Sequence, residues 1–494
     1  MFSSDAELQK SLDEFAADPR GASSKNPIKR DENGALIERP RTAFDASDLA
    51  DGHFALHRDS LRKTFHTVID GVMVSLEGCT PGKAPIEAID RPENLVDQLA
   101  YRTLTEMETN GLRKASLAIT PWSDDYWALY LGCLGKRYSD PDFPGSEDWE
   151  ENYEYVRENP VQQVLASGSA KAVDQLSPSE KYDLLIGDAS GSLTTAMWNE
   201  GKWYFDRNGA VETWMGICHG WAPASYMLSR PTREVILLAA DGKTKLRFYP
   251  ADIKALASLL WANANTVSRL IGGRCNDKNP ACDENGRVIS SKVFDTNPGT
   301  WHLCVVNQIG VNKRSFVMDA TYDYEVWNQP ICRYEYKYFN PQTLKVAKDL
   351  KSAKVTKARF TKDRFRKYRS ASAASFVGVM MEVSYVAEHE PTTRATDGAA
   401  NDNINTVLYK YDLELDANGR IIGGEWYTGK AHPDFLWTPP PGTRAISEAE
   451  QFATGDWSAD TALPEAWRRA ARRAAGSNLP LAKIVEALIR FSNR

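Results

Sequence analysis

The chain has 494 residues, of which 42% are hydrophobic and 26% charged, an ordinary composition for a protein that buries a core. Its net charge of −6 argues against a general nucleic-acid binder, which would be strongly positive. No apolar run reaches the roughly 18 residues that cross a membrane. We therefore predict neither a nucleic-acid nor a membrane partner.

The first 60 residues are polar and contain no apolar signal-peptide stretch. We predict an extended or loosely held arm over residues 1–60, and a pro-segment that covers the site is one candidate role for it. The absence of a signal stretch predicts an intracellular protein, unless a signal peptide has been trimmed from a secreted one.

Residues 61–440 are predicted to form one α+β domain, because their strand-like runs cluster instead of alternating strictly with helices. Apolar residues at helical spacing predict helices over 90–112 and 251–273. Runs rich in Val, Ile and aromatic residues predict strands. These runs are 233–240, 300–310, 315–322, 376–388 and 405–427, the last a hairpin turning at Asn418-Gly419.

Two charged segments and the C-terminal tail complete the chain. Residues 140–155 are acidic and aromatic; they could hold calcium, although a solvated acidic loop explains them more simply. Residues 345–369 contain eleven Lys or Arg and two Asp, a positive band that could dock an acidic partner or be a solvated face. Residues 441–494 are predicted to form a helical tail with helices over 463–476 and 479–491, each opened by a proline.

The seven cysteines leave two interpretations open. An odd number in a secreted protein indicates three disulfides and one reactive thiol, whereas a cytosolic protein could keep seven thiols. No CxxC spacing occurs, so no metal site of the zinc type is predicted. Cys275 and Cys282 bracket a short loop and are either a disulfide or two unrelated thiols.

Cys218 is the candidate nucleophile, in the segment TWMGICHGWAPASYML. Gly216 allows a tight turn before it, and Pro223 fits only near the start of the helix that follows. A thiol at a helix N-terminus lies at the positive end of the helix dipole, which stabilises the thiolate. The thiolate is the species that attacks a carbonyl carbon.

His302 is the candidate base, because the adjacent His219 would point in a different direction from Cys218 on a helix. His302 is predicted to lie on a strand, and Asp319 on a neighbouring one. Asp319 would then orient the imidazole and support its charge. Asp323 is a substitute for Asp319, since an even spacing keeps it on the same face of a strand.

Five segments resemble the transglutaminase elicitor family, a group of transglutaminase-like cysteine enzymes of the papain type. They are GICHGWAPAS, RCND, DTNPGTWHLCVVNQIG, SFVMDATYDYEVWNQP and IIGGEWYTGKAHPDFLW, and the resemblance spans roughly residues 65–440. It implies a papain-like or transglutaminase-like core, with the nucleophile-bearing helix packed on an antiparallel sheet. It further implies a Cys218, His302 and Asp319 triad, secretion with disulfide bonds, and possible help from calcium.

The implied reaction joins glutamine side chains of proteins or peptides to lysines or other small primary amines, through a Cys218 thioester and with no required cofactor. Trp214, Trp221 and Trp301 flank the triad residues. They could line a cleft that excludes water or supply an oxyanion donor, but each is as readily explained as plain core.

Two rival interpretations remain. A protein glutamine deamidase or a papain-type protease would use the same triad with another acceptor or leaving group. A binding protein or elicitor with a vestigial triad would use its aromatic or basic residues for recognition instead.

Overall fold

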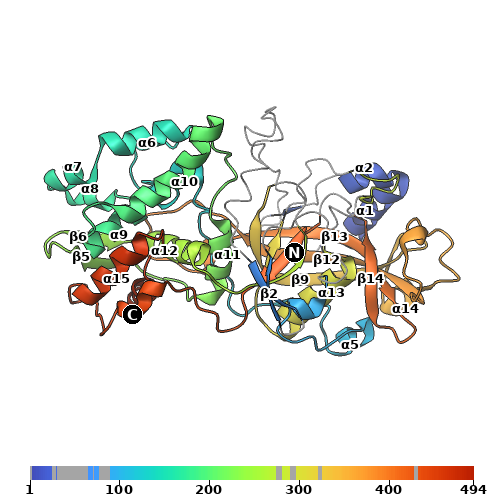
Figure 1. Cartoon of the computed structure of the whole chain (residues 1–494). Coiled ribbons are helices and arrows are strands. Elements are labelled where there is room, and N and C mark those ends of the chain that lie inside the picture. The colour runs from blue at the N-terminus through green and yellow to red at the C-terminus, as the bar shows by residue number, and fades with distance from the viewer. Residues whose placement is uncertain are drawn as a thin grey trace.

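The computed structural model describes residues 3–24, 29–30, 65–69, 72–76, 90–273, 281–289, 296–320, 325–427 and 432–494 (Figure 1). The α-helices are α1 (Asp5–Ala17), α2 (Pro19–Ser24), α5 (Leu104–Thr109), α6 (Trp149–Glu158), α7 (Val161–Ala166), α8 (Ala170–Asp174), α9 (Pro178–Ile186), α10 (Ser192–Asn208), α11 (Cys218–Met227), α12 (Pro250–Asn263), α13 (Pro298–Val305), α14 (Leu350–Ala353), α15 (Glu465–Ala475) and α16 (Ala482–Ser492). The strands are β1 (Lys29–Arg30), β2 (Phe65–Ile69), β3 (Val72–Leu76), β4 (Lys114–Ser116), β5 (Val235–Leu238), β6 (Lys245–Phe248), β7 (Arg269–Gly272), β8 (Val317–Asp319), β9 (Asn328–Asn340), β10 (Lys345–Ala347), β11 (Val355–Thr356), β12 (Ser375–Ala387), β13 (Asn403–Leu415), β14 (Ile421–Trp426) and β15 (Phe435–Thr438). None of the helices described is long and apolar enough to cross a bilayer.

The main sheet is antiparallel, with strand order β1-β13-β12-β9-β8-β15-β7. The interior strand β12 is buried at every position, because other elements cover both faces of the sheet. The β13–β14 hairpin has Gly419 at φ 79°, a backbone conformation that glycine adopts without steric cost. The predicted α+β class and the predicted hairpin turn are therefore confirmed.

The two faces of the sheet carry different layers. On one face α13 packs over rows of tyrosines from β9 and β13, including Tyr336 and Tyr411. On the other face α1 packs Leu8, Leu12 and Phe15 against the sheet. The expectation of a loosely held arm is thus wrong for residues 3–24, because Leu8, Leu12, Phe15 and Ala22 are buried in this contact.

Helices α9, α10, α12, α15 and α16 form a second body beside the sheet, with a shared apolar core (Figure 1). The two helices predicted for the tail are present as α15 and α16. Helix α11 lies between this body and the sheet (Figure 1). It approaches α12 closely at Gly220, where an added Cβ would lie 2.1 Å from the Ser258 carbonyl oxygen.

Three predicted elements differ from those observed. The helix predicted over 90–112 is a 3-10 turn followed by the short helix α5. The helix predicted over 251–273 ends at Asn263 and is followed by β7. The strand predicted over 300–310 is instead helical, because Asn297 caps α13 by accepting from the Gly299 N–H and Pro298 occupies its first turn.

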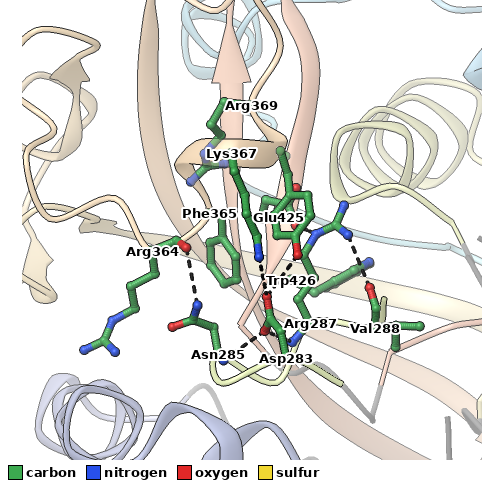
Figure 2. A network of polar contacts seen from close by, with 12 residues as sticks. Asp283, Asn285, Arg287, Val288, Arg364, Phe365, Lys367, Arg369, Glu425 and Trp426 are labelled. Carbon is green, nitrogen blue, oxygen red and sulfur yellow. Dashed lines mark hydrogen bonds and ion pairs between the residues drawn. The ribbon is translucent and has the colours of Figure 1, made fainter. Parts of the chain in front are cut away.

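A polar network fastens residues 281–289 to β14 and to the basic segment (Figure 2). Arg287 Nε lies 2.7 Å from a Glu425 carboxylate oxygen, and the Arg287 guanidinium stacks on the Tyr368 ring. Asp283 accepts a hydrogen bond from the Tyr368 hydroxyl and lies 3.9 Å from Lys367 Nζ. Part of the basic segment is therefore occupied by partners within the chain.

Candidate functional site

Cys218 begins helix α11, and its side chain is almost fully buried, with the residue 5% exposed. Ile217 is the N-cap residue and offers no side-chain cap, so the positive end of the helix faces the thiol. Cys218 Sγ donates to the Val326 carbonyl oxygen at 3.7 Å and accepts from Asn328 Nδ2 at 3.4 Å. The predicted helix start at Cys218 is confirmed.

The pKa of Cys218 reflects opposing influences. Burial raises it to about 11. The Asn328 hydrogen bonds lower it, while the negative charges of Glu388 and Asp319 raise it. A buried thiolate therefore depends on the donors around it.

Three neighbouring strands place polar side chains on the face of the sheet that α11 covers. Asp319 on β8 is opposite Asn328 on β9, and Trp437 on β15 is opposite Val317 on β8. Val317 and Trp437 pack against Ala222 of α11, and side chains two residues apart share a face. Asp319, Asn328 and Trp437 thus lie on the side of Cys218.

Asp319 is fully buried, and its Oδ1 accepts from the Trp327 N–H at 3.0 Å. It is opposite Asn328, whose amide contacts the Cys218 sulfur, and its negative charge raises the pKa of Cys218. The structure therefore brings these two predicted site residues into one region.

His302 lies elsewhere, on α13 against the opposite face of the sheet. Its Nδ1 is 2.9 Å from the Tyr411 hydroxyl, and its ring packs edge-on to Tyr336. Its Nε2 has no hydrogen-bond partner among the described residues, and burial lowers the pKa of His302 to about 3. The prediction of neighbouring strands that join His302 to Asp319 is wrong, because His302 is helical and faces the tyrosine layer.

The three tryptophans also differ in position. Trp221 is fully buried, and its indole N–H donates to the Trp122 carbonyl oxygen at 2.9 Å. Trp214 donates to the Glu212 carboxylate. Trp301 lies beside His302 in the tyrosine layer, on the face away from Cys218. The N–H of Trp221 is thus engaged by a backbone carbonyl.

Other predicted groups have a structural role or lie outside the described residues. Cys275 and Asp323 lie outside them, so the Cys275–Cys282 disulfide and the substitute role of Asp323 stay predictions. In the acidic segment Asp148 caps α6, and Asp140 accepts from the Tyr155 hydroxyl. Within the parts of the chain that the structure describes, no group of three or more His, Cys, Asp or Glu side chains could hold a metal.

Asn328 and Trp437 are the site residues that sequence reasoning missed. Both lie in segments that carry the family resemblance, EVWNQP and PDFLW, and that was the available signal. Trp437 Nε1 donates to Asn328 Oδ1 at 2.8 Å, and Asn328 Nδ2 in turn faces the thiol. The thiol environment therefore includes a tryptophan–asparagine pair.

Comparison with known proteins defines the class. The family model described as transglutaminase elicitor matches residues 96–449, more than half of the chain, and the chain belongs to this family. Among solved structures, the chain is similar to the GP42 transglutaminase from Phytophthora sojae. The identity is 22% and the TM-score 0.45, over 69% of this chain and 86% of the other. No curated protein matches the chain.

Proposed function

We propose that the chain is a protein-glutamine γ-glutamyltransferase that uses Cys218 as its nucleophile. The observation that carries the proposal is the thiol at the N-terminus of α11 with an amide donor 3.4 Å from its sulfur. Membership of the transglutaminase elicitor family supports the same chemistry. The substrates would be proteins or peptides that supply glutamine and lysine side chains, or small primary amines.

The reaction begins when the Cys218 thiolate attacks the carboxamide carbon of glutamine. The C–N bond then breaks, the nitrogen takes a proton, and ammonia leaves a thioester on the sulfur. A lysine amine attacks the thioester carbon and loses a proton, and the C–S bond breaks to give an isopeptide and the free thiolate. If water attacks instead, the product is glutamate.

Proton transfer needs a group within hydrogen-bond reach of the thiol or the leaving nitrogen. His302, the predicted base, does not meet this condition where it packs on Tyr411. Consecutive helix residues point in different directions, but His219 is the histidine nearest to Cys218 in the sequence and is partly exposed, so it is the first histidine to test. We expect His219→Gln to reduce amine incorporation more than His302→Gln, when each is measured as activity per folded protein.

The main test is incorporation of a fluorescent primary amine into a glutamine-rich protein, with ammonia release measured in the same samples. Wild type should label the protein, and Cys218→Ala should not. Cys332→Ala is the matched control, because Cys332 is also a buried thiol, and burial likewise raises its pKa to about 12. Its activity should remain near that of wild type.

The rival functions give other results in the same assay. Ammonia without labelling would indicate a deamidase, and cleavage of the glutamine-rich protein would indicate a protease. If both signals are absent, with and without calcium, the result would contradict an acyltransferase acting on these substrates. It would favour a non-catalytic elicitor.

A further inference from the structure

A tryptophan–asparagine pair lies beside the Cys218 sulfur. Asn328 Nδ2 lies 3.4 Å from the sulfur, and Trp437 Nε1 lies 2.8 Å from Asn328 Oδ1. All three residues are buried, with 5% or less of each exposed. Hydrogen bonds at such a site gain strength because little water competes with them.

The orientation of the Asn328 amide follows from hydrogen-bond chemistry. An indole N–H can only donate, whereas an asparagine amide has one accepting and one donating end. The end that faces Trp437 must therefore be the oxygen, which leaves the NH₂ group facing the sulfur. The reverse orientation would set two donors against each other and turn the amide oxygen towards the sulfur.

A donor at this position favours the thiolate over the thiol, because a hydrogen bond to a charged acceptor is the stronger one. It opposes both burial and the negative charges of Asp319 and Glu388, which disfavour the thiolate. The strand register supports the arrangement, since β15 and β9 both pair with β8 and bring Trp437 and Asn328 to the same face.

We propose that Asn328 is a catalytic residue that stabilises the Cys218 thiolate, and that Trp437 is a positioning residue that fixes the direction of its amide. The inference rests on the proposed function for its catalytic meaning. The effect of the Asn328 amide on the Cys218 thiol, however, exists whether or not the chain cross-links proteins.

The test is the rate of alkylation of Cys218 by iodoacetamide as a function of pH in the full-length chain, with Cys218→Ala as the background. Asn328→Leu removes the donor at similar volume and should move the midpoint of the profile upward. A shift of one pKa unit slows alkylation about tenfold at a pH below both midpoints. Asn340→Leu, at the far end of β9, is the matched control and should leave the profile unchanged.

Asn328→Asp keeps an acceptor for Trp437 and replaces the donor with a carboxylate oxygen. It should raise the midpoint at least as far as Asn328→Leu does. If the leucine variant does not fold, the aspartate variant tests the same prediction. Trp437→Phe should shift the profile in the same direction. The double variant that carries both Trp437→Phe and Asn328→Leu should have the same alkylation midpoint as Asn328→Leu alone, because the tryptophan acts through the asparagine.

An unchanged profile in folded Asn328→Leu or Asn328→Asp would overturn the inference. Full additivity of Trp437→Phe with Asn328→Leu would overturn the positioning role of Trp437. These outcomes differ from failure of the proposed function, because alkylation requires only a reactive thiol, whereas amine incorporation requires the whole reaction.

Discussion

Gly220 sets the distance between the helix that carries Cys218 and its neighbour α12. A Cβ at this position would lie 2.1 Å from the Ser258 carbonyl oxygen and 2.6 Å from the Ala262 Cβ. A carbon–oxygen contact needs roughly 3.2 Å, so Gly220→Ala would push the helices apart by about 1 Å. The sulfur of Cys218, two residues earlier on α11, would move with the helix relative to Asn328.

The expected effect of this substitution on stability has a definite sign. Alanine in place of glycine favours a helix by about 1 kcal/mol. Forcing an extra group into a packed contact costs about 1–3 kcal/mol, and here the obstacle is a backbone oxygen. We expect a net loss of about 1 kcal/mol and slower alkylation of Cys218.

Urea unfolding and the alkylation rate at one pH measure both consequences. Gly398→Ala is the matched control, since an added Cβ there meets nothing within 4 Å and its φ is not positive. A Gly220→Ala chain that is as stable as wild type, with unchanged alkylation, would refute the close packing of α11 on α12.

Three further substitutions test the packing and the charges. Lys181 and Asp252 form a fully buried ion pair at 2.8 Å, so Lys181→Met should cost about 3–5 kcal/mol in urea unfolding by leaving a buried carboxylate; a loss below about 1 kcal/mol would contradict this. Burial raises the pKa of Asp183 from 3.8 to about 7, so the folded state favours the protonated carboxyl. The stability that this protonation contributes is fully present below about pH 4 and is lost as the pH rises through about 7. Urea midpoints between pH 4 and 7 should therefore fall less in Asp183→Asn than in wild type, and parallel curves would disprove the shift. Phe15 stacks on Tyr427, with ring centroids 4.7 Å apart, so Phe15→Ala should loosen α1 and speed its removal by limited proteolysis; wild-type resistance would show that α1 is held by other contacts.

Local signals predicted the elements that depend on local chemistry. Gly216 marked the start of α11, and the Asn418-Gly419 turn marked the β13–β14 hairpin. Pro223 was expected in the first turn of α11 but is its sixth residue, inside the helix. The error at residues 300–310 arose because an apolar run of Val, Leu and Cys fits a buried helix as well as a strand. The Asn297-Pro298 pair before it is a helix-start signal that favours α13.

The candidate site could be predicted only in part, because sheet register is a long-range property. Cys218 and Asp319 were predicted from their sequence context, and they share a region because Asn328, opposite Asp319 in the sheet, contacts the Cys218 sulfur. Asn328 and Trp437 are 109 residues apart and meet only because their strands both pair with β8. No spacing rule in one sequence specifies such a register.

The charge that the basic segment, residues 345–369, exposes also depends on partners that are distant in the sequence. Arg369 is almost completely buried, and its guanidinium binds the carboxylates of Asp412 and Asp363. Lys345 forms an ion pair with Asp13 on α1. A local count of +9 therefore overstates the charge that this segment offers to an external partner, because Asp412 and Asp13 from outside the segment also pair with its cations.

The central claim is that Cys218 forms a thioester with glutamine, and mass spectrometry of the amine-labelling reaction tests it most directly. The account predicts that wild type joins the amine to glutamine side chains with release of at least one ammonia per amine, and that Cys218→Ala does neither. Labelling that persists in folded Cys218→Ala would contradict the account, because it would assign the chemistry to another nucleophile.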